Sequence, residues 1–136
     1  MANKRFLLEV ITPERVLVSE EVDMVIIPGM QGEFQVYTGH TPFLTDLAVG
    51  QVSYDSGGKR SYLSISGGFC EVTPTRTRIL AHTAESPEMI DKARAQAARD
   101  RAANRLTAKD TVPINEERAR LALIRALNRI SVADMR

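Results

Sequence analysis

The chain is short of cysteine, tryptophan and long apolar runs, and each shortage excludes a class of protein. Of its 136 residues one is cysteine, Cys70, and none is tryptophan. A single cysteine excludes an internal disulfide framework and a metal site built from several thiolates. No stretch approaches the roughly 18 consecutive apolar residues that a membrane-spanning helix needs. We therefore expect a cytosolic protein, also because the first six residues lack the apolar core of a signal peptide.

An excess of charge of one sign is also missing. The chain has 18 Lys+Arg and 17 Asp+Glu, so its formal net charge is +1. This balance disfavours a protein dedicated to nucleic acid, and no aromatic residue lies beside the C-terminal arginines to stack on bases.

Glycine and aromatic residues are absent from the second part of the chain. All eight glycines lie at Gly68 or earlier, and all seven aromatics lie at Phe69 or earlier. Residues 1–84 carry 7 Lys+Arg against 9 Asp+Glu, whereas residues 85–136 carry 11 against 8. This shift in composition predicts two structural units, 1–84 and 85–136.

The first unit has the pattern of short β-strands joined by glycine-rich turns. Phe6, Leu8 and Val10 alternate with the residues between them, which is the period of a strand. The pair 57–58 predicts a hairpin turn, and the pair 67–68 predicts a turn or β-bulge with positive φ, because glycine adopts positive φ without steric cost. Such a pattern predicts a β-sandwich or a small barrel.

The second unit has the pattern of two helices. Ser86 is expected to cap the first, with Pro87 at its first position, and Pro113 interrupts before Asn115 caps the second. Apolar residues at 3–4 spacing predict one buried stripe on the second helix, formed by Ala119, Ala122, Leu123, Ala126, Leu127 and Ile130. The first helix has a thinner stripe, formed by Ala95, Ala98, Ala102 and Leu106.

The alanine content of these stripes limits how strongly the hairpin can be held. Burial stabilises by about 25 cal/mol per Å² of apolar surface, and alanine offers little surface. We therefore interpret the hairpin as detachable from the sandwich, and a permanently docked hairpin is the alternative.

The chain offers little for catalysis. It lacks a phosphate-binding Gly-x-x-x-x-Gly-Lys-Ser/Thr loop, and His40, His82 and Cys70 have no partner that would complete a nucleophile or metal site. We therefore expect no catalytic residues and no metal requirement.

The helical unit instead offers arginines at helical spacing. Arg94 and Arg101 are seven residues apart, Arg125 and Arg129 are four apart, and Asp91 shares a face with Arg94. Antiparallel packing would bring the arginine groups together into a pocket for a polyphosphate, since guanidinium groups bind phosphate oxygens bidentately. An ordinary solvated charged face is the alternative that spacing alone leaves open.

Several motifs together resemble one family, the epsilon subunit of bacterial F-type ATP synthase. They cover nearly the whole chain in the right order, at residues 10–13 (Val-Ile-Thr-Pro), 32–34 (Gly-Glu-Phe), 39–42 (Gly-His-Thr-Pro), 66–72 (Ser-Gly-Gly-Phe-Cys-Glu-Val) and 125–133 (Arg-Ala-Leu-Asn-Arg-Ile-Ser-Val-Ala).

The resemblance implies an α+β fold, with a flattened antiparallel β-sandwich of about ten strands followed by a two-helix antiparallel hairpin. It implies a non-catalytic subunit of the proton-translocating complex, peripheral to the cytoplasmic face of the bacterial membrane. The sandwich would dock on the gamma subunit and the c ring, with Glu33 and His40 facing the ring. The hairpin would inhibit hydrolysis when it extends to the alpha and beta subunits, and would permit rotation when folded.

Some members of that family bind ATP on the folded hairpin as a regulatory ligand. Their pattern Ile/Leu-Asp-x-x-Arg-Ala is met here by Ile90, Asp91, Arg94 and Ala95. The resemblance further assigns ATP contacts to Glu85, Arg101, Arg125 and Arg129. A free-standing small ATP sensor, with the sandwich as a mere scaffold, is the alternative function.

Overall fold

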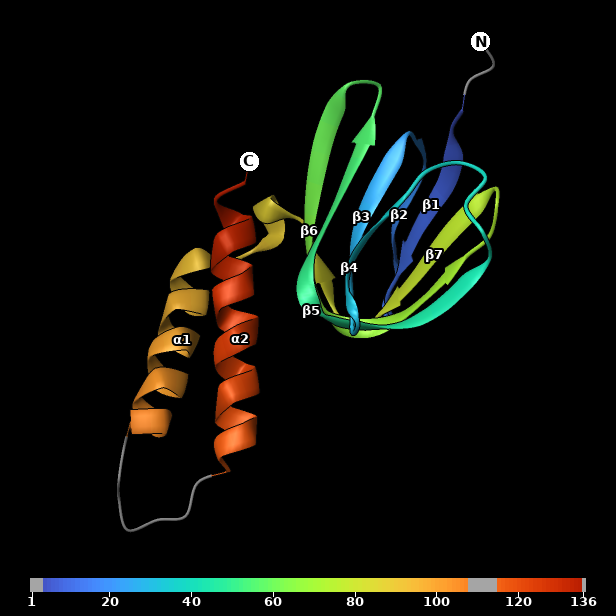
Figure 1. Cartoon of the computed structure of the whole chain (residues 1–136). Helices are drawn as coiled ribbons and strands as arrows, with labels where there is room; N and C mark the ends of the chain where they lie inside the picture. The colour runs from blue at the N-terminus through green and yellow to red at the C-terminus, as the bar shows by residue number, and fades with distance from the viewer. Residues whose placement is uncertain (1–3, 108–114, 136) are drawn as a thin grey trace.

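The computed structural model describes residues 4–107 and 115–135, which form a β-sandwich followed by a helical hairpin (Figure 1). The eight strands are β1 (Phe6–Ile11), β2 (Val16–Val22), β3 (Met24–Gly29), β4 (Gly32–Val36), β5 (Phe43–Ser56), β6 (Lys59–Val72), β7 (Arg76–Ala81) and β8 (Ala84–Glu85). A 3₁₀ turn, η1 (Pro87–Met89), precedes the helices α1 (Lys92–Thr107) and α2 (Glu116–Ala133). The expected fold class is confirmed, and β8 straddles the expected unit boundary between residues 84 and 85.

The strand count and one strand direction differ from expectation. The strands pair in the order β2-β1-β7-β6-β5-β3-β4, with β8 also on β6. The described residues form eight strands rather than about ten. Two of them, β5 and β6, are long strands of 14 residues that pair with each other throughout, and the other edge of β6 pairs with β8 and then with β7. The pair β1–β7 is parallel, whereas the other pairs described are antiparallel. Its strands are far apart in sequence, so no tight turn fixes their direction.

Glycine permits close backbone approach in the middle of β6. Gly67 and Gly68 have φ values of +105° and +138°, as predicted, and a Cβ on Gly68 would lie 2.1 Å from the carbonyl oxygen of Leu80. The predicted turn or bulge is wrong, because β5 and β6 keep one register through this point. The hairpin turn at Gly57 and Gly58 is confirmed, with φ values of +59° and +83°.

The sandwich has one hydrophobic core to which all eight strands contribute. Phe6, Leu8 and Val10 are buried, which confirms the alternation in the first strand. Cys70 is fully buried in this core, and burial raises the pKa of its thiol to about 12. The side chain of Thr77 is also buried there, and its hydroxyl has no hydrogen-bond partner in the described residues.

The helix starts follow capping chemistry, with one departure from expectation. The side chain of Asn115 accepts a hydrogen bond from the Arg118 amide at 3.0 Å, which confirms the cap of α2. The expected Ser86 cap is wrong: its side chain makes no capping bond, and the extended backbone of Ile90 separates η1 from α1. Asp91 caps α1 instead, since its carboxylate accepts from the Arg94 amide at 3.0 Å. Pro113, the expected interruption between the helices, lies outside the described residues.

The hairpin is folded against the sandwich, with α2 packed on β5 and β6 and α1 packed on α2 (Figure 1). As predicted, the helices meet through buried alanines, which are Ala95 and Ala102 on α1 and Ala119 and Ala126 on α2. The expected burial of Leu127 is wrong, because its side chain is 47% exposed. The larger side chains of Leu121, Ile124 and Leu127 lie at three-residue spacing and form an exposed apolar row on α2.

Candidate functional site

A groove of about 410 Å³ lies between the hairpin and the sandwich. Three arginines line its hairpin wall, Arg94 from α1 and Arg125 and Arg129 from α2. The groove has room beside these long side chains because the helical residues between them are small, Ala98, Ala122 and Ala126. Residues of β5, β6, β8 and the position before β8 form the sandwich wall. They are Val49, Ser64, Ile65, Ser66, Thr83 and Glu85.

The charge of the groove favours an anion. Its lining has three guanidinium groups and one carboxylate, that of Glu85, which gives a net charge of +2. Guanidinium groups stay protonated at any physiological pH and offer five N–H donors each. The arrangement can therefore hold a group with several acceptor oxygens, such as a polyphosphate.

One of the arginines is already paired across the groove. Arg129 Nε donates to Glu85 Oε1 at 2.7 Å, and Arg129 Nη2 donates to Glu85 Oε2 at 3.0 Å. The two side chains are 27% and 25% exposed, so this bidentate pair is partly shielded from water. It ties α2 to β8.

Asn128 makes the neighbouring contact between α2 and the sandwich. Its Nδ2 donates to the Gly50 carbonyl at 2.8 Å and to Ser64 Oγ at 2.9 Å. Glycine is required at position 50, because a Cβ there would lie 2.7 Å from the side chain of Pro28. These bonds fix the rotation of α2 at the turn that carries Arg129.

The apolar contact that holds the end of α2 is small. Val132 and Ala133 are buried with Ile90, and Tyr62 packs against them from the sandwich. Lys92 Nζ and Asp134 Oδ1 lie 2.6 Å apart at the exposed edge of this cluster. The folded hairpin is thus attached through a few polar bonds and one small apolar cluster.

The structure brings together some of the sequence-predicted ATP residues. Glu85, Arg94, Arg125 and Arg129 line the groove. Ile90, Asp91, Ala95 and Arg101 are not part of its lining. Ile90 lies in the cluster at the end of α2, Asp91 caps α1, Ala95 packs between the helices, and Arg101 is exposed on α1.

Sequence reasoning missed the groove's uncharged polar residues. These are Asn128 on the hairpin and Ser64, Ser66 and Thr83 on the sandwich. One signal was available: the two serines alternate with Leu63 and Ile65, which predicts hydroxyls on one face of that strand.

Glu33 lies on β4, and His40 lies in the segment between β4 and β5. Glu33, Phe34 and Phe43 are among the residues that line a hollow of about 240 Å³. His40 Nδ1 lies 2.6 Å from the Thr41 carbonyl oxygen, and its ring centre lies 6.4 Å from that of Phe43. Nearby in sequence, the large apolar side chains of Met30 and Tyr37 are exposed.

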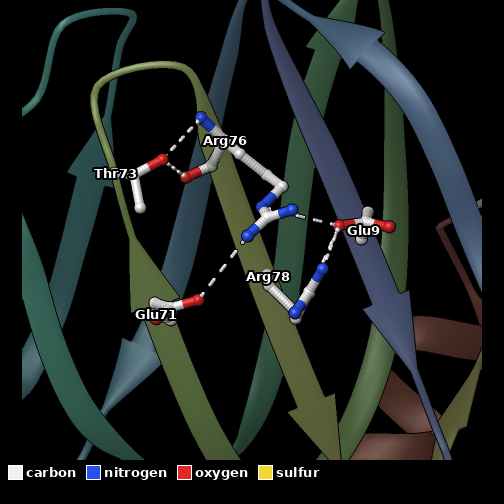
Figure 2. Close-up of polar contacts among 5 residues, drawn as sticks. All are labelled: Glu9, Glu71, Thr73, Arg76 and Arg78. Carbon is white, nitrogen blue, oxygen red and sulfur yellow. Dashed lines mark hydrogen bonds and ion pairs between the residues drawn. The ribbon is translucent and has the colours of Figure 1, made fainter.

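The outer face of β1, β7 and β6 carries a charged network beside an apolar row. Figure 2 shows Glu9 in contact with two arginines of the neighbouring strand β7, with its Oε1 3.3 Å from Arg78 Nη2 and 3.8 Å from Arg76 Nε. Arg76 also reaches Glu71 at 3.9 Å. The next row is apolar, because Leu80 pairs with Ile11 on one side and Phe69 on the other.

Two further observations concern residues 4–107 and 115–135 only. No three His, Cys, Asp or Glu side chains gather there as a ligand set for a metal ion. No helix in these ranges is long and apolar enough to cross a membrane.

A β-sandwich with an appended helical hairpin defines the class of this protein, and family comparison makes the class specific. Residues 5–87 match the model "ATP synthase, Delta/Epsilon chain, beta-sandwich domain". Residues 88–134 match the model "ATP synthase, Delta/Epsilon chain, long alpha-helix domain". The chain belongs to the family of ATP synthase epsilon chains.

Curated relatives agree with this assignment. The ATP synthase epsilon chain of Nitratidesulfovibrio vulgaris (strain DP4) is 46% identical over 99 residues, which cover 73% of this chain and 74% of the relative. That of Desulfosudis oleivorans is 50% identical over 100 residues, which cover 73% and 75% of the two chains.

Solved structures share the fold at low identity. A chain in the cryo-EM structure of Euglena gracilis mitochondrial ATP synthase (OSCP/F1/c-ring) matches with a TM-score of 0.82 and 23% identity, covering 98% of this chain and 83% of that one. A chain in the central stalk/c-ring structure from Tetrahymena thermophila matches with a TM-score of 0.56 and 8% identity, covering 99% and 98%.

Proposed function

We propose that this chain is a non-catalytic central-stalk subunit of a proton-translocating F-type ATP synthase whose hairpin regulates ATP hydrolysis by the complex. Family membership supports the place in the complex. The observation that carries the regulatory part is the cationic groove between the hairpin and the sandwich. A ligand in that groove touches both units, so it binds only while the hairpin is folded.

The ligand that this groove fits is ATP. Arg94, Arg125 and Arg129 would hold the phosphates, and the apolar part of the wall, at Val49, Ile65 and the three alanines, accommodates less polar atoms. The groove's own net charge of +2 offsets much of the phosphate charge, so a metal ion is not required.

The contacts between the hairpin and the sandwich are weak enough for a ligand to decide their balance. A ligand that binds only the folded state stabilises it by about 2.7 kcal/mol at a hundredfold excess over Kd. Each polar bond between the hairpin and the sandwich contributes a net stabilisation of roughly 0.5–1.5 kcal/mol, because bonds to water replace it when the hairpin opens. In the extended state, the exposed row Leu121, Ile124 and Leu127 and the released arginines would face the alpha and beta subunits.

The sandwich provides the lasting attachment in this proposal. The apolar row Ile11, Leu80 and Phe69 beside the charged network suits the gamma subunit, and the end with Glu33 and His40 suits the c ring. Attachment through these subunits would keep the chain peripheral to the cytoplasmic face of the membrane.

Calorimetric titration of the purified chain with ATP, with and without magnesium, tests the nucleotide part. We expect saturable binding in both conditions, and binding at least tenfold weaker in Arg94→Ala and Arg125→Ala. Unchanged affinity in both variants would reject the groove as the site. Copurification with gamma tests the place in the complex, because a free-standing sensor would bring down no stalk subunit.

A further inference from the structure

Two hydroxyl groups in the sandwich wall of the groove, those of Ser66 and Thr83, bond to each other and to no other side chain or backbone group in the described residues. Thr83 Oγ1 donates to Ser66 Oγ at 2.6 Å, and neither side chain makes a further hydrogen bond there. Both residues line the groove, opposite Arg94 and Arg125. The pair is held in place by backbone pairing, since the Ser66 amide donates to the Thr83 carbonyl at 3.2 Å.

The pair forms the second of two polar rows under α2. In the first row Ser64 pairs with Glu85, and these side chains bond to Asn128 and Arg129. The second row lies two residues further along the strands, about 6.6 Å away. One turn of a helix spans about 5.4 Å, so the second row corresponds to the turn of α2 that carries Arg125. Among the described residues no helix side chain bonds to this row, and the groove opens there.

The chemistry of the pair suits a neutral polar group. Two hydroxyls bonded to each other still offer one hydrogen and several lone pairs. Phosphate is drawn to the arginine wall instead, because the carboxylate of Glu85 lies two residues from Thr83 on the sandwich wall. The remaining part of a nucleotide, its sugar and base, presents hydroxyl, amino and ring-nitrogen groups that match such a pair.

We propose that Ser66 and Thr83 bind the nucleoside part of the ligand, while the arginines hold its phosphates. This inference rests on the proposed function, which supplies ATP as the ligand. It adds specificity to the site, because an anion without a nucleoside would miss this contact. It also places the two ends of one ligand on the two units, which restricts binding to the folded state.

The test compares ATP with inorganic tripolyphosphate on the full chain. Calorimetry gives the ATP affinity, and competition against a fluorescent ATP analogue gives that of tripolyphosphate. Thr83→Val removes the hydroxyl at nearly constant volume, and Thr83→Ser retains it as the matched control. We expect Thr83→Val to bind ATP about five- to tenfold more weakly with unchanged affinity for tripolyphosphate, and Thr83→Ser to bind both like the parent chain.

Other outcomes overturn distinct claims. Equal ATP affinity of the parent chain and Thr83→Val overturns this inference alone, as does an equal loss for ATP and tripolyphosphate. A parent chain that binds neither probe overturns the nucleotide site of the proposed function and the inference with it. Two further ligands identify the contacted group. If the sugar 2′-hydroxyl is the partner, the parent chain and Thr83→Val should bind 2′-deoxy-ATP with equal affinity. If the base is the partner, the two chains should bind GTP with equal affinity.

Discussion

Glu85 of the sandwich and Arg129 of the hairpin form a bidentate ion pair, with N–O distances of 2.7 and 3.0 Å. Water solvates both charged groups when they separate, whereas an interface of leucine side chains would expose apolar surface to water. The pair therefore sets the position of α2 without fixing it permanently, and phosphates that approach Arg129 share or compete for the same donors. This relationship makes specific predictions about the hairpin.

Glu85→Gln should shift the hairpin toward the open state. The variant keeps the shape of the side chain but loses the charge-assisted bonds, which we expect to cost about 1 kcal/mol, or about a fivefold change in the folded-to-open ratio. Glu88→Gln, an exposed neighbour, is the control. Spin labels on the sandwich and on α2 report the ratio as two distance populations, and identical populations in both variants would show that the pair does not hold the hairpin.

Arg125→Ala should weaken ATP binding at least tenfold, because it removes a guanidinium from the groove wall. Arg101→Ala should leave affinity within about twofold, since that side chain is exposed outside the groove lining, and Arg120→Ala is a control on α2 itself. Calorimetry at fixed ionic strength checks all three. Equal losses in the three variants would mean that general positive charge, rather than the groove, binds ATP.

The sequence was sufficient for the fold class, and four of its eight candidate ATP-binding residues line the groove. Alternation in β1, the glycine turn and the Asn115 cap are local signals, so they could be predicted. The Ser86 cap could not be rejected, because the extended Ile90 that separates η1 from α1 reflects its burial against Val132, 42 residues away. Likewise, Asn128 has no local signal, since its partners Gly50 and Ser64 belong to distant strands.

Thr77→Val should stabilise the sandwich by about 1 kcal/mol. The Thr77 hydroxyl is fully buried without a partner in the described residues, so an isosteric methyl group removes a desolvation cost. This corresponds to a rise of about 5 °C in Tm for a domain of this size. Thermal unfolding followed by circular dichroism checks it against Thr75→Val, whose parent side chain is exposed. A lower Tm for Thr77→Val than for the parent would mean that the hydroxyl has a partner after all.

The buried Cys70 thiol should make stability fall at alkaline pH. Its pKa is raised from 9.0 to about 12 by burial, so the folded state keeps the proton while the unfolded state loses it. The contribution of the buried, protonated thiol to the free energy of unfolding is therefore complete below about pH 9, and it is lost as the pH rises toward 12. Urea unfolding at pH 8, 9.5 and 10.5 should show a steeper decline for the parent than for Cys70→Val. Parallel declines would contradict this account of the thiol.

The most direct test of the account is the distance between sandwich and hairpin with and without ATP. Spin labels at positions 75 and 120, in a Cys70→Val background, are measured by double electron–electron resonance in the full chain. We predict a folded and an open population without nucleotide, and a single short distance at saturating ATP. One unchanged distribution in both conditions would contradict a hairpin whose position the ligand decides.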